Sequence, residues 1–204
     1  MRLGLLGPAE DREEALERAV EFLFQDVAVG RAVYLGVDQA LERVVRRRAE
    51  QLVGGDPDDD AIWRRAAEAC ARASAAEIDS FIVVERERRA LSVFESLPGN
   101  GKCVIELLNG KLVVMTHDKA DLDEEDILPA SLLVFGKSAQ PLVKQVGSRW
   151  FLAPGHLGEF GVMTLEDHDD GIHLALFDSA GREVRRERLI AAHQPKLRVT
   201  GAAD

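Results

Sequence analysis

The sequence has little cysteine and no long apolar run. Its two cysteines, Cys70 and Cys103, form no CxxC pair and have no nearby histidines at ligand spacing, which favours buried thiols over a disulfide or a metal site. The first residues lack a signal-peptide pattern, because Met1-Arg2 leads into only four apolar residues before a Gly-Pro pair. No later run approaches the length of a membrane span. We therefore expect a cytoplasmic protein with no membrane partner.

A basic excess is also absent. The 36 Asp and Glu residues outnumber the 26 Lys and Arg residues, so the formal net charge is −10. Such a charge repels nucleic acid unless a local basic patch overcomes it. The run Arg46-Arg47-Arg48 suits a solvated helix end, and the arginines of residues 182–198 have the pattern of a solvated edge strand followed by a loose end. We therefore expect no nucleic-acid partner. The expected partner is a protein of unknown identity, and a homo-oligomer is possible.

Internal repeats and low-complexity linkers are missing as well. At 204 residues, with 46% apolar and 30% charged residues, the chain fits one packed soluble domain. We expect this domain to span residues 1–190, and residues 191–204 to form a loose C-terminal tail.

The first half of the chain alternates between short apolar runs and helical spacing of apolar residues. Runs of this kind that end abruptly in Gly or Pro are typical of buried parallel strands. Strands are expected over residues 3–6, 32–35 and 81–84, and helices over 16–24, 40–53, 62–73 and 85–94. This order predicts a parallel sheet with right-handed crossovers.

From Cys103 onward the pattern changes to short strands separated by turns. Asn109-Gly110 lies between two β-rich runs and is the strongest short hairpin signal in the chain. Further strands are expected over residues 131–135, 142–146, 150–153, 161–165 and 172–177. The second half therefore predicts an antiparallel-rich sheet.

The order of these elements, together with short motifs at the strand ends, resembles the calcineurin-like metallophosphoesterase family, in particular its small bacterial phosphodiesterase branch. The likeness covers roughly residues 1 to 178. The matching segments are the opening strand and helix (1–16), Tyr34-Leu35-Gly36, the hairpin that ends in Thr116-His117, Val134-Phe135-Gly136 and Ala153-Pro154-Gly155. The resemblance implies an α/β fold, a metallophosphoesterase-like αββα sandwich of two mixed β-sheets flanked by helices.

The family holds two divalent metals on carboxylates, imidazoles and an amide, and most of these positions are replaced here. The resemblance places Pro8 and Glu10 at its Asp-x-His turn, Val37 at its Gly-Asp, His117 at the hairpin end, and Lys137 and Ala139 at its final histidine pair. Valine and alanine carry no ligand atom, and a lysine ammonium repels a divalent cation. At these former active-site positions His117 is the one matched ligand that remains.

Two hypotheses follow from these replacements. The first is a catalytically inactive module, without cofactor, that binds or regulates a protein. The second is a metal-dependent phosphoesterase or phosphodiesterase with an atypical site for Mn²⁺ or another divalent metal, built from Glu10, Asp38, His117 and His156.

Two geometric expectations accompany the hypotheses. The turns after Leu6, Leu35, Val84, Thr116 and Phe135 should meet at one edge, since each run ends abruptly. Lys137 should supply the positive charge that the metals would have supplied. We expect it to pair with Glu10, or failing that with Asp38 or Asp118.

Overall fold

The computed structural model of the protein describes residues 1–72, 74–99 and 102–189. The expected tail, residues 191–204, lies outside the described residues. In chain order the elements are β1 (Arg2–Leu6), α1 (Glu13–Glu21), η1 (Phe22–Asp26), β2 (Arg31–Tyr34), α2 (Ala40–Val53), η2 (Asp59–Ala61), α3 (Ile62–Arg72), α4 (Ala75–Ala90), η3 (Leu91–Val93), β3 (Phe94–Ser96), β4 (Val104–Leu108), β5 (Lys111–Thr116), η4 (Lys119–Asp121), α5 (Glu124–Ile127), β6 (Leu132–Phe135), β7 (Leu142–Val146), β8 (Arg149–Ala153), β9 (Val162–His168), β10 (Gly171–Phe177) and β11 (Glu183–Leu189).

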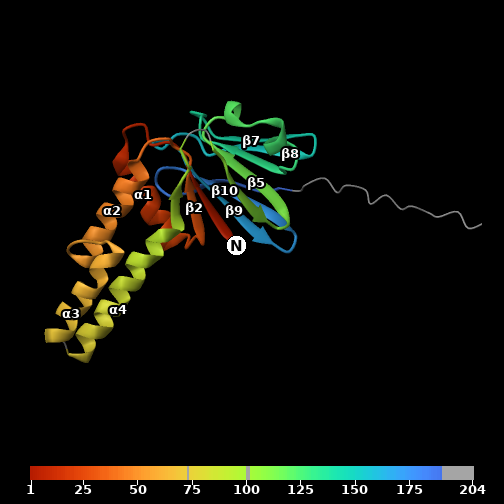
Figure 1. The fold of residues 1–204 in the computed structure, drawn as a ribbon. Helices are drawn as coiled ribbons and strands as arrows, with labels where there is room; N and C mark the ends of the chain where they lie inside the picture. Colours follow the sequence, from red (N-terminus) through yellow and green to blue (C-terminus); the bar gives the residue numbers. More distant parts are fainter. Residues whose placement is uncertain (73, 100–101, 190–204) are drawn as a thin grey trace, which may run out of the picture.

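Two mixed sheets pack face to face. The first has the order β11-β10-β9-β1-β2-β3 and the second the order β4-β5-β6-β8-β7. In the first sheet β1, β2 and β3 pair in parallel, whereas β9, β10 and β11 pair antiparallel. The expected arginine-rich edge strand is β11. Helices α1 and α2 cover the outer face of the first sheet (Figure 1).

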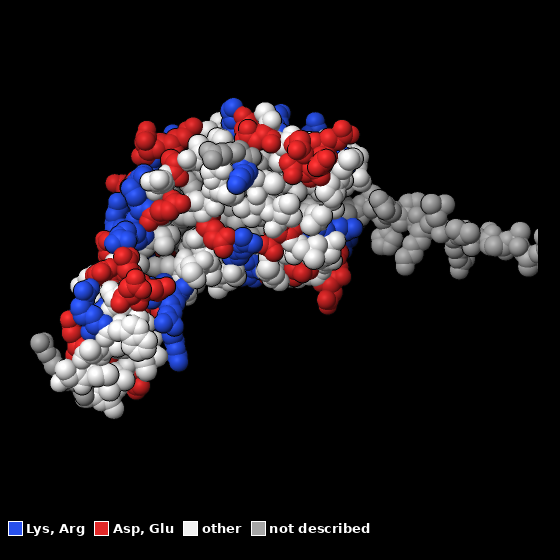
Figure 2. Space-filling model, viewed as in Figure 1, with Lys and Arg blue, Asp and Glu red and all other residues white. Residues whose placement is uncertain are grey.

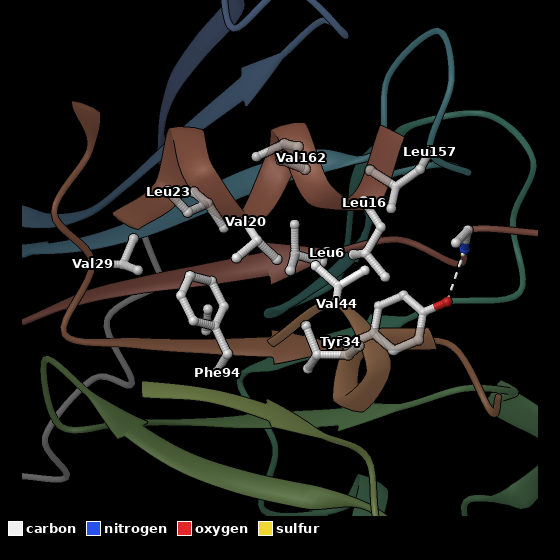
Figure 3. Close-up of a cluster of buried hydrophobic side chains, with 14 of the residues drawn as sticks. Leu6, Leu16, Val20, Leu23, Val29, Tyr34, Val44, Phe94, Leu157 and Val162 are labelled. Atoms are coloured by element: carbon white, nitrogen blue, oxygen red, sulfur yellow. Dashed lines mark hydrogen bonds between the residues drawn. The ribbon is translucent and has the colours of Figure 1, made fainter. Parts of the chain in front are cut away.

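Strand alternation divides the first sheet's side chains between two cores. Leu5 and Val33 point into the core between the sheets, while Leu6 and Tyr34 point toward α1 and α2. Figure 3 shows this helix-side core, in which Leu16 of α1 and other apolar residues pack on the sheet. Because β1 and β2 are buried on both faces, their sequences are almost uniformly apolar, as the parallel assignment required.

The second sheet has a much thinner helical cover. Its outer face carries a small core of Val114, Ala130 and Leu133, with Ile127 of α5 packed against it. The predicted αββα sandwich of two mixed sheets flanked by helices is confirmed, with the four-residue α5 as part of its second helical layer.

The expected strand over residues 81–84 is wrong. These residues lie inside α4, whose first turn is closed by a capping box between Ser74 and Glu77. The run of four β-type residues is too short to interrupt a helix that is capped at its start and continues on both sides of the run. The parallel neighbour of β2 is instead β3, in which Phe94 lies opposite Ala32.

Helices α3 and α4 form an arm that projects away from the two sheets (Figure 1). Cys70 lies on this arm and is exposed, so the expectation that it is buried is wrong; Cys103 is half-buried. Within the described ranges, no helix has the length and apolar character that crossing a bilayer requires.

Candidate functional site

The turns after β1, β2, β5 and β6 meet at one edge of the sandwich, which we call the strand-end edge. The backbone N–H of Lys137 donates to the carbonyl of His117 over 2.8 Å, and that of Leu157 donates to the carbonyl of Pro8 over 2.9 Å. The ring Nδ1 of His117 lies 2.8 Å from the carbonyl oxygen of Leu35. The expected convergence is confirmed for the turns after β1, β2, β5 and β6. It is wrong for the turn after Val84, because that residue lies within α4.

Two glycines allow these turns to approach one another so closely. A Cβ atom on Gly136 would lie 2.3 Å from the carbonyl oxygen of Leu35, and one on Gly7 would lie 1.7 Å from that of Gly155. Real Cβ atoms do not tolerate such contacts, so the edge requires glycine at both positions.

The turn after β1 presents Glu10 to the loop after β8. Glu10 and Asp11 both adopt positive φ values, 45° and 67°, a conformation that non-glycine residues rarely adopt. The carboxylate of Glu10 lies 2.8 Å from Nδ1 of His156. Glu10 and His156 are therefore far apart in sequence but form one polar pair at this edge.

Tyr34 occupies the space beneath these turns. Its side chain is fully buried, and its hydroxyl accepts a hydrogen bond from the Ala9 N–H over 2.9 Å, drawn in Figure 3. The same hydroxyl donates to the carboxylate of Asp38, also over 2.9 Å. Burial, together with the neighbouring Asp38 carboxylate, raises the pKa of the Tyr34 phenol well above its usual value. Tyr34 therefore links the turn after β1 to the turn after β2.

Sequence reasoning missed this role of Tyr34. It is the one tyrosine in the chain, it ends a strand, and an aspartate follows four residues later. A lone phenol at the end of a buried strand needs a hydrogen-bond partner for its hydroxyl, and that requirement was the available signal.

Lys137 pairs with Asp118 and not with Glu10. Its ammonium lies 2.5 Å from the Asp118 carboxylate. The first expectation was wrong because β5 and β6 run parallel with Thr116 opposite Phe135, so the residues two positions beyond each strand are also neighbours. Hydrogen bonding to Lys137 lowers the pKa of Asp118, and Asp118 raises the pKa of Lys137 in turn. Asp118 was the last of the three partners expected.

The arrangement of sheets and turns is shared with solved structures. Vacuolar Protein Sorting 29 from Cryptosporidium parvum superimposes with a TM-score of 0.51 at 14% identity, covering 92% of this chain and 97% of that one. The same protein from Chaetomium thermophilum gives 0.50 at 11% identity (92% and 96%). A predicted phosphoesterase from Streptococcus pneumoniae gives 0.50 at 9% identity (92% and 98%). This chain has the calcineurin-like metallophosphoesterase fold. No protein-family model and no curated protein sequence matches it, and identities this low define the fold alone.

Within the metallophosphoesterase fold, three of the positions named from the sequence carry no ligand side chain. Pro8 is buried, Val37 is 76% exposed, and Ala139 is exposed. Ala139 contributes only its carbonyl oxygen, which accepts from the backbone N–H of His156 over 3.3 Å. Of the remaining three, Glu10 and Lys137 have the side-chain partners already described, and Nδ1 of His117 contacts a backbone carbonyl.

The alternative metal set divides into separate contacts. Glu10 pairs with His156, Asp38 accepts from Tyr34, and His117 contacts Leu35. In the part of the chain that the structure describes, no group of three or more His, Cys, Asp or Glu side chains is placed to hold a metal ion. Since a carbonyl oxygen only accepts, Nδ1 of His117 is the donor in this contact.

A cleft of about 620 Å³ opens beside this edge, between the first turns of α1 and α2. Its charged lining includes Asp11, Arg12, Arg18, Asp38 and Arg43. Arg43 is ion-paired with Glu13, and Arg12 donates to the carbonyl of Leu157 over 2.9 Å. The cleft therefore presents charges of both signs, and several of its polar groups already have partners within the protein.

Proposed function

We propose that the chain is a catalytically inactive metallophosphoesterase-like module that acts by binding or regulating another protein. One observation carries the proposal: the polar side chains at the edge where the strands end are paired with one another. Glu10 pairs with His156, Asp38 with Tyr34 and Lys137 with Asp118. Groups satisfied in this way are poorly disposed to bind a metal or a phosphate ester.

The donor chemistry of the edge does not fit a two-metal centre. Such a centre needs several carboxylate and imidazole ligands that converge and clamp the attacking and leaving oxygens. Here Val37 and Ala139 offer no side-chain donor, and the ammonium of Lys137 adds positive charge where two dications would need negative charge.

The same edge has features of a contact surface. Val37 is an apolar side chain that is three-quarters exposed. Its turn is anchored on both sides, by the bond from the Leu35 N–H to the Leu6 carbonyl and by the bond from the Tyr34 hydroxyl to Asp38. An apolar protrusion on an anchored turn, with polar pairs around it, needs little ordering when a partner binds. A protein partner matches this pattern better than nucleic acid does, because the chain carries a net charge of −10.

The proposal is tested by rebuilding the ligand positions. Purified wild type and the variant Pro8→Asp, Glu10→His, Val37→Asp, Lys137→His, Ala139→His are equilibrated with Mn²⁺ or Zn²⁺ and desalted. Bound metal is then measured by mass spectrometry, and hydrolysis of a bis-aryl phosphate is followed. We expect no stoichiometric metal and no turnover from wild type, and metal retention by the rebuilt variant. Circular dichroism checks that both proteins fold.

The outcome that supports the second hypothesis is equally specific. If wild type retains metal in stoichiometric amounts and hydrolyses the ester, and if His117→Ala abolishes that turnover, the chain is a phosphoesterase with an atypical site. A matched variant, His173→Ala, removes a histidine of β10 that pairs with Asp170 and should leave any such activity unchanged.

A further inference from the structure

The arm formed by α3 and α4 exposes several large apolar side chains. Trp63 on α3 is 80% exposed, and on α4 Ile78, Ile82 and Val83 are 36%, 39% and 51% exposed. Figure 2 shows the end of the arm as a largely uncharged surface, in contrast to the charged surface around its base. Contiguous exposed apolar patches of this kind mark interaction sites more often than scattered single residues do.

The contact between the two helices is made by other side chains. The half-buried apolar positions are Ile62, Ala66 and Ala69 on α3 and Phe81 and Val84 on α4, at the spacing of one helix face. Near the base of the arm, Glu85 binds both Arg65 and Arg88. The internal packing of the arm therefore leaves the exposed apolar side chains without a role.

Helical periodicity places most of these side chains on one surface of the hairpin. At 100° per residue, Trp63 and Cys70 share the flank of α3 beside its buried stripe, and Ile78 and Ile82 share the flank of α4 beside its own. Because consecutive helices in a tight hairpin run antiparallel, these two flanks face the same side of the arm. The result is an apolar flank shared by the two helices. The side of α4 that faces away from α3 carries Ile82 and Val83, with Asp79 and Arg86 about one turn to either side of them.

The arm also differs from the rest of the protein in charge. Residues 62–90 contain six arginines and five acidic residues, a net charge of +1, although the whole chain carries −10. The rest of the chain carries a net charge of −11 (−10 minus +1), so two copies would repel one another far less through their arms than through the remainder. A side-by-side, antiparallel contact between two arms keeps the sheet domains at opposite ends.

The sequence of α4 is complementary to itself in this antiparallel arrangement. With Ile82 opposite Val83 of a second copy, Asp79 lies opposite Arg86, and the two-fold axis repeats the pair. Both charged side chains are exposed, and neither has a partner among the described residues. One register therefore aligns the apolar centre and two reciprocal pairs of opposite charge.

We propose that a second copy of this chain docks on α4, antiparallel, with Ile82 and Val83 at the two-fold axis and Asp79 paired with Arg86 across the interface. Exposed apolar patches on soluble proteins are typically on the order of 300–600 Å², below the roughly 800 Å² that each partner of a standard interface buries. The dimer is therefore weak and reversible, with association in the micromolar range. This inference rests on the arm and is independent of the function proposed for the strand-end edge.

Sedimentation velocity over a concentration series tests the interface by charge exchange. Arg86→Asp places two aspartates opposite each other at each end of the contact and should weaken association about tenfold or more. Asp79→Arg should weaken it similarly, and the double variant Asp79→Arg, Arg86→Asp should restore it, because the pairs re-form with their signs exchanged. Lys144→Asp is the matched control, since it makes the same charge change at an exposed position on β7 and should leave association unchanged.

Two results overturn the proposal. One is a wild type that stays monomeric up to hundreds of micromolar, which leaves the arm for some other partner. The other is a dimer that Arg86→Asp weakens no more than Lys144→Asp does, or that the double variant fails to restore. Neither result bears on metal binding or hydrolysis, so the inference and the proposed function fail separately.

Discussion

Replacing Tyr34 by phenylalanine removes one oxygen atom from the centre of the strand-end edge. The ring stays in the helix-side core and leaves no cavity, so the change isolates two hydrogen bonds. One is accepted from the N–H of Ala9, a residue with no exposed surface. The other is donated to the carboxylate of Asp38. The substitution leaves a buried amide without its partner and removes the cross-link between two turns.

The expected loss of stability follows from these two contacts. An unsatisfied buried donor costs about 1–3 kcal/mol, and a hydrogen bond to a charged group contributes about 1.5–3 kcal/mol. The two values do not add fully. Asp38 also accepts a hydrogen bond from the N–H of Ala40, so its carboxylate still has a partner after the substitution. We expect Tyr34→Phe to lower the free energy of unfolding by about 2–3 kcal/mol. For a chain of this size, that corresponds to a fall of roughly 4–12 °C in Tm.

Urea denaturation of a double-mutant cycle measures the effect. The cycle comprises wild type, Tyr34→Phe, Asp38→Ala and the double variant, and the two sites should couple by at least about 0.5 kcal/mol because they are in contact. A loss below about 0.5 kcal/mol for Tyr34→Phe, with no coupling to Asp38, would refute the assigned role of the hydroxyl.

The same hydroxyl gives a pH signature. The pKa of Tyr34 is raised in the folded state, whereas an unfolded tyrosine ionises near pH 10. Its contribution is therefore complete below about pH 10 and is lost as the pH rises further, because the unfolded chain then binds fewer protons. Since the chain has one tyrosine, Tyr34→Phe should remove the phenol's part of the alkaline destabilisation, and phenolate absorbance in wild type should appear only as the protein unfolds.

Three further changes test the surrounding structure. Lys137→Met should raise the pKa of Asp118 toward its usual value, as measured by NMR titration. In wild type the lowered pKa adds to the free energy of unfolding near neutral pH, and this contribution is lost as the pH falls through that pKa; the variant should lack it. Gly136→Ala should destabilise the fold strongly, because its Cβ would meet a backbone carbonyl oxygen, whereas Gly55→Ala, with open space around it, should be nearly neutral in the same thermal melt. Glu85→Gln removes the carboxylate shared by two arginines and should cost roughly 3–5 kcal/mol, with increased hydrogen exchange concentrated in α3 and α4; uniform exchange across the chain would count against a local role.

Local sequence signals predicted most of the strands, but not that β9, β10 and β11 join β1, β2 and β3 in one sheet. Asn109 and Gly110 both adopt positive φ, 49° and 66°, as the expected tight hairpin requires. The apolar run that ends at Gly7 became a central strand because a strand buried on both faces needs no polar alternation. These features are encoded within a few residues, so a pattern detects them.

The partners at the strand-end edge depend on distant contacts and were harder to predict. Glu10 meets His156 only because the loop after β8 folds against the turn after β1. Lys137 meets Asp118 because of the parallel register of β5 and β6, which the sequence does not reveal. The error at residues 81–84 had a different cause, since their β propensity was outweighed by the helix that surrounds them.

The polar pairs and the backbone contacts at this edge have separable effects. The turns are held together by main-chain hydrogen bonds such as that from Leu157 to Pro8, and by the glycine contacts at Gly7 and Gly136. None of these interactions uses a metal-ligand side chain, so their strength does not depend on which side chains stand at Val37 or Lys137. Side chains at the edge could therefore change while the turns kept their positions. A buried or half-buried polar group at this edge needs a nearby partner to offset the cost of desolvating it. The Tyr34 hydroxyl has two such partners, the Ala9 N–H and the Asp38 carboxylate.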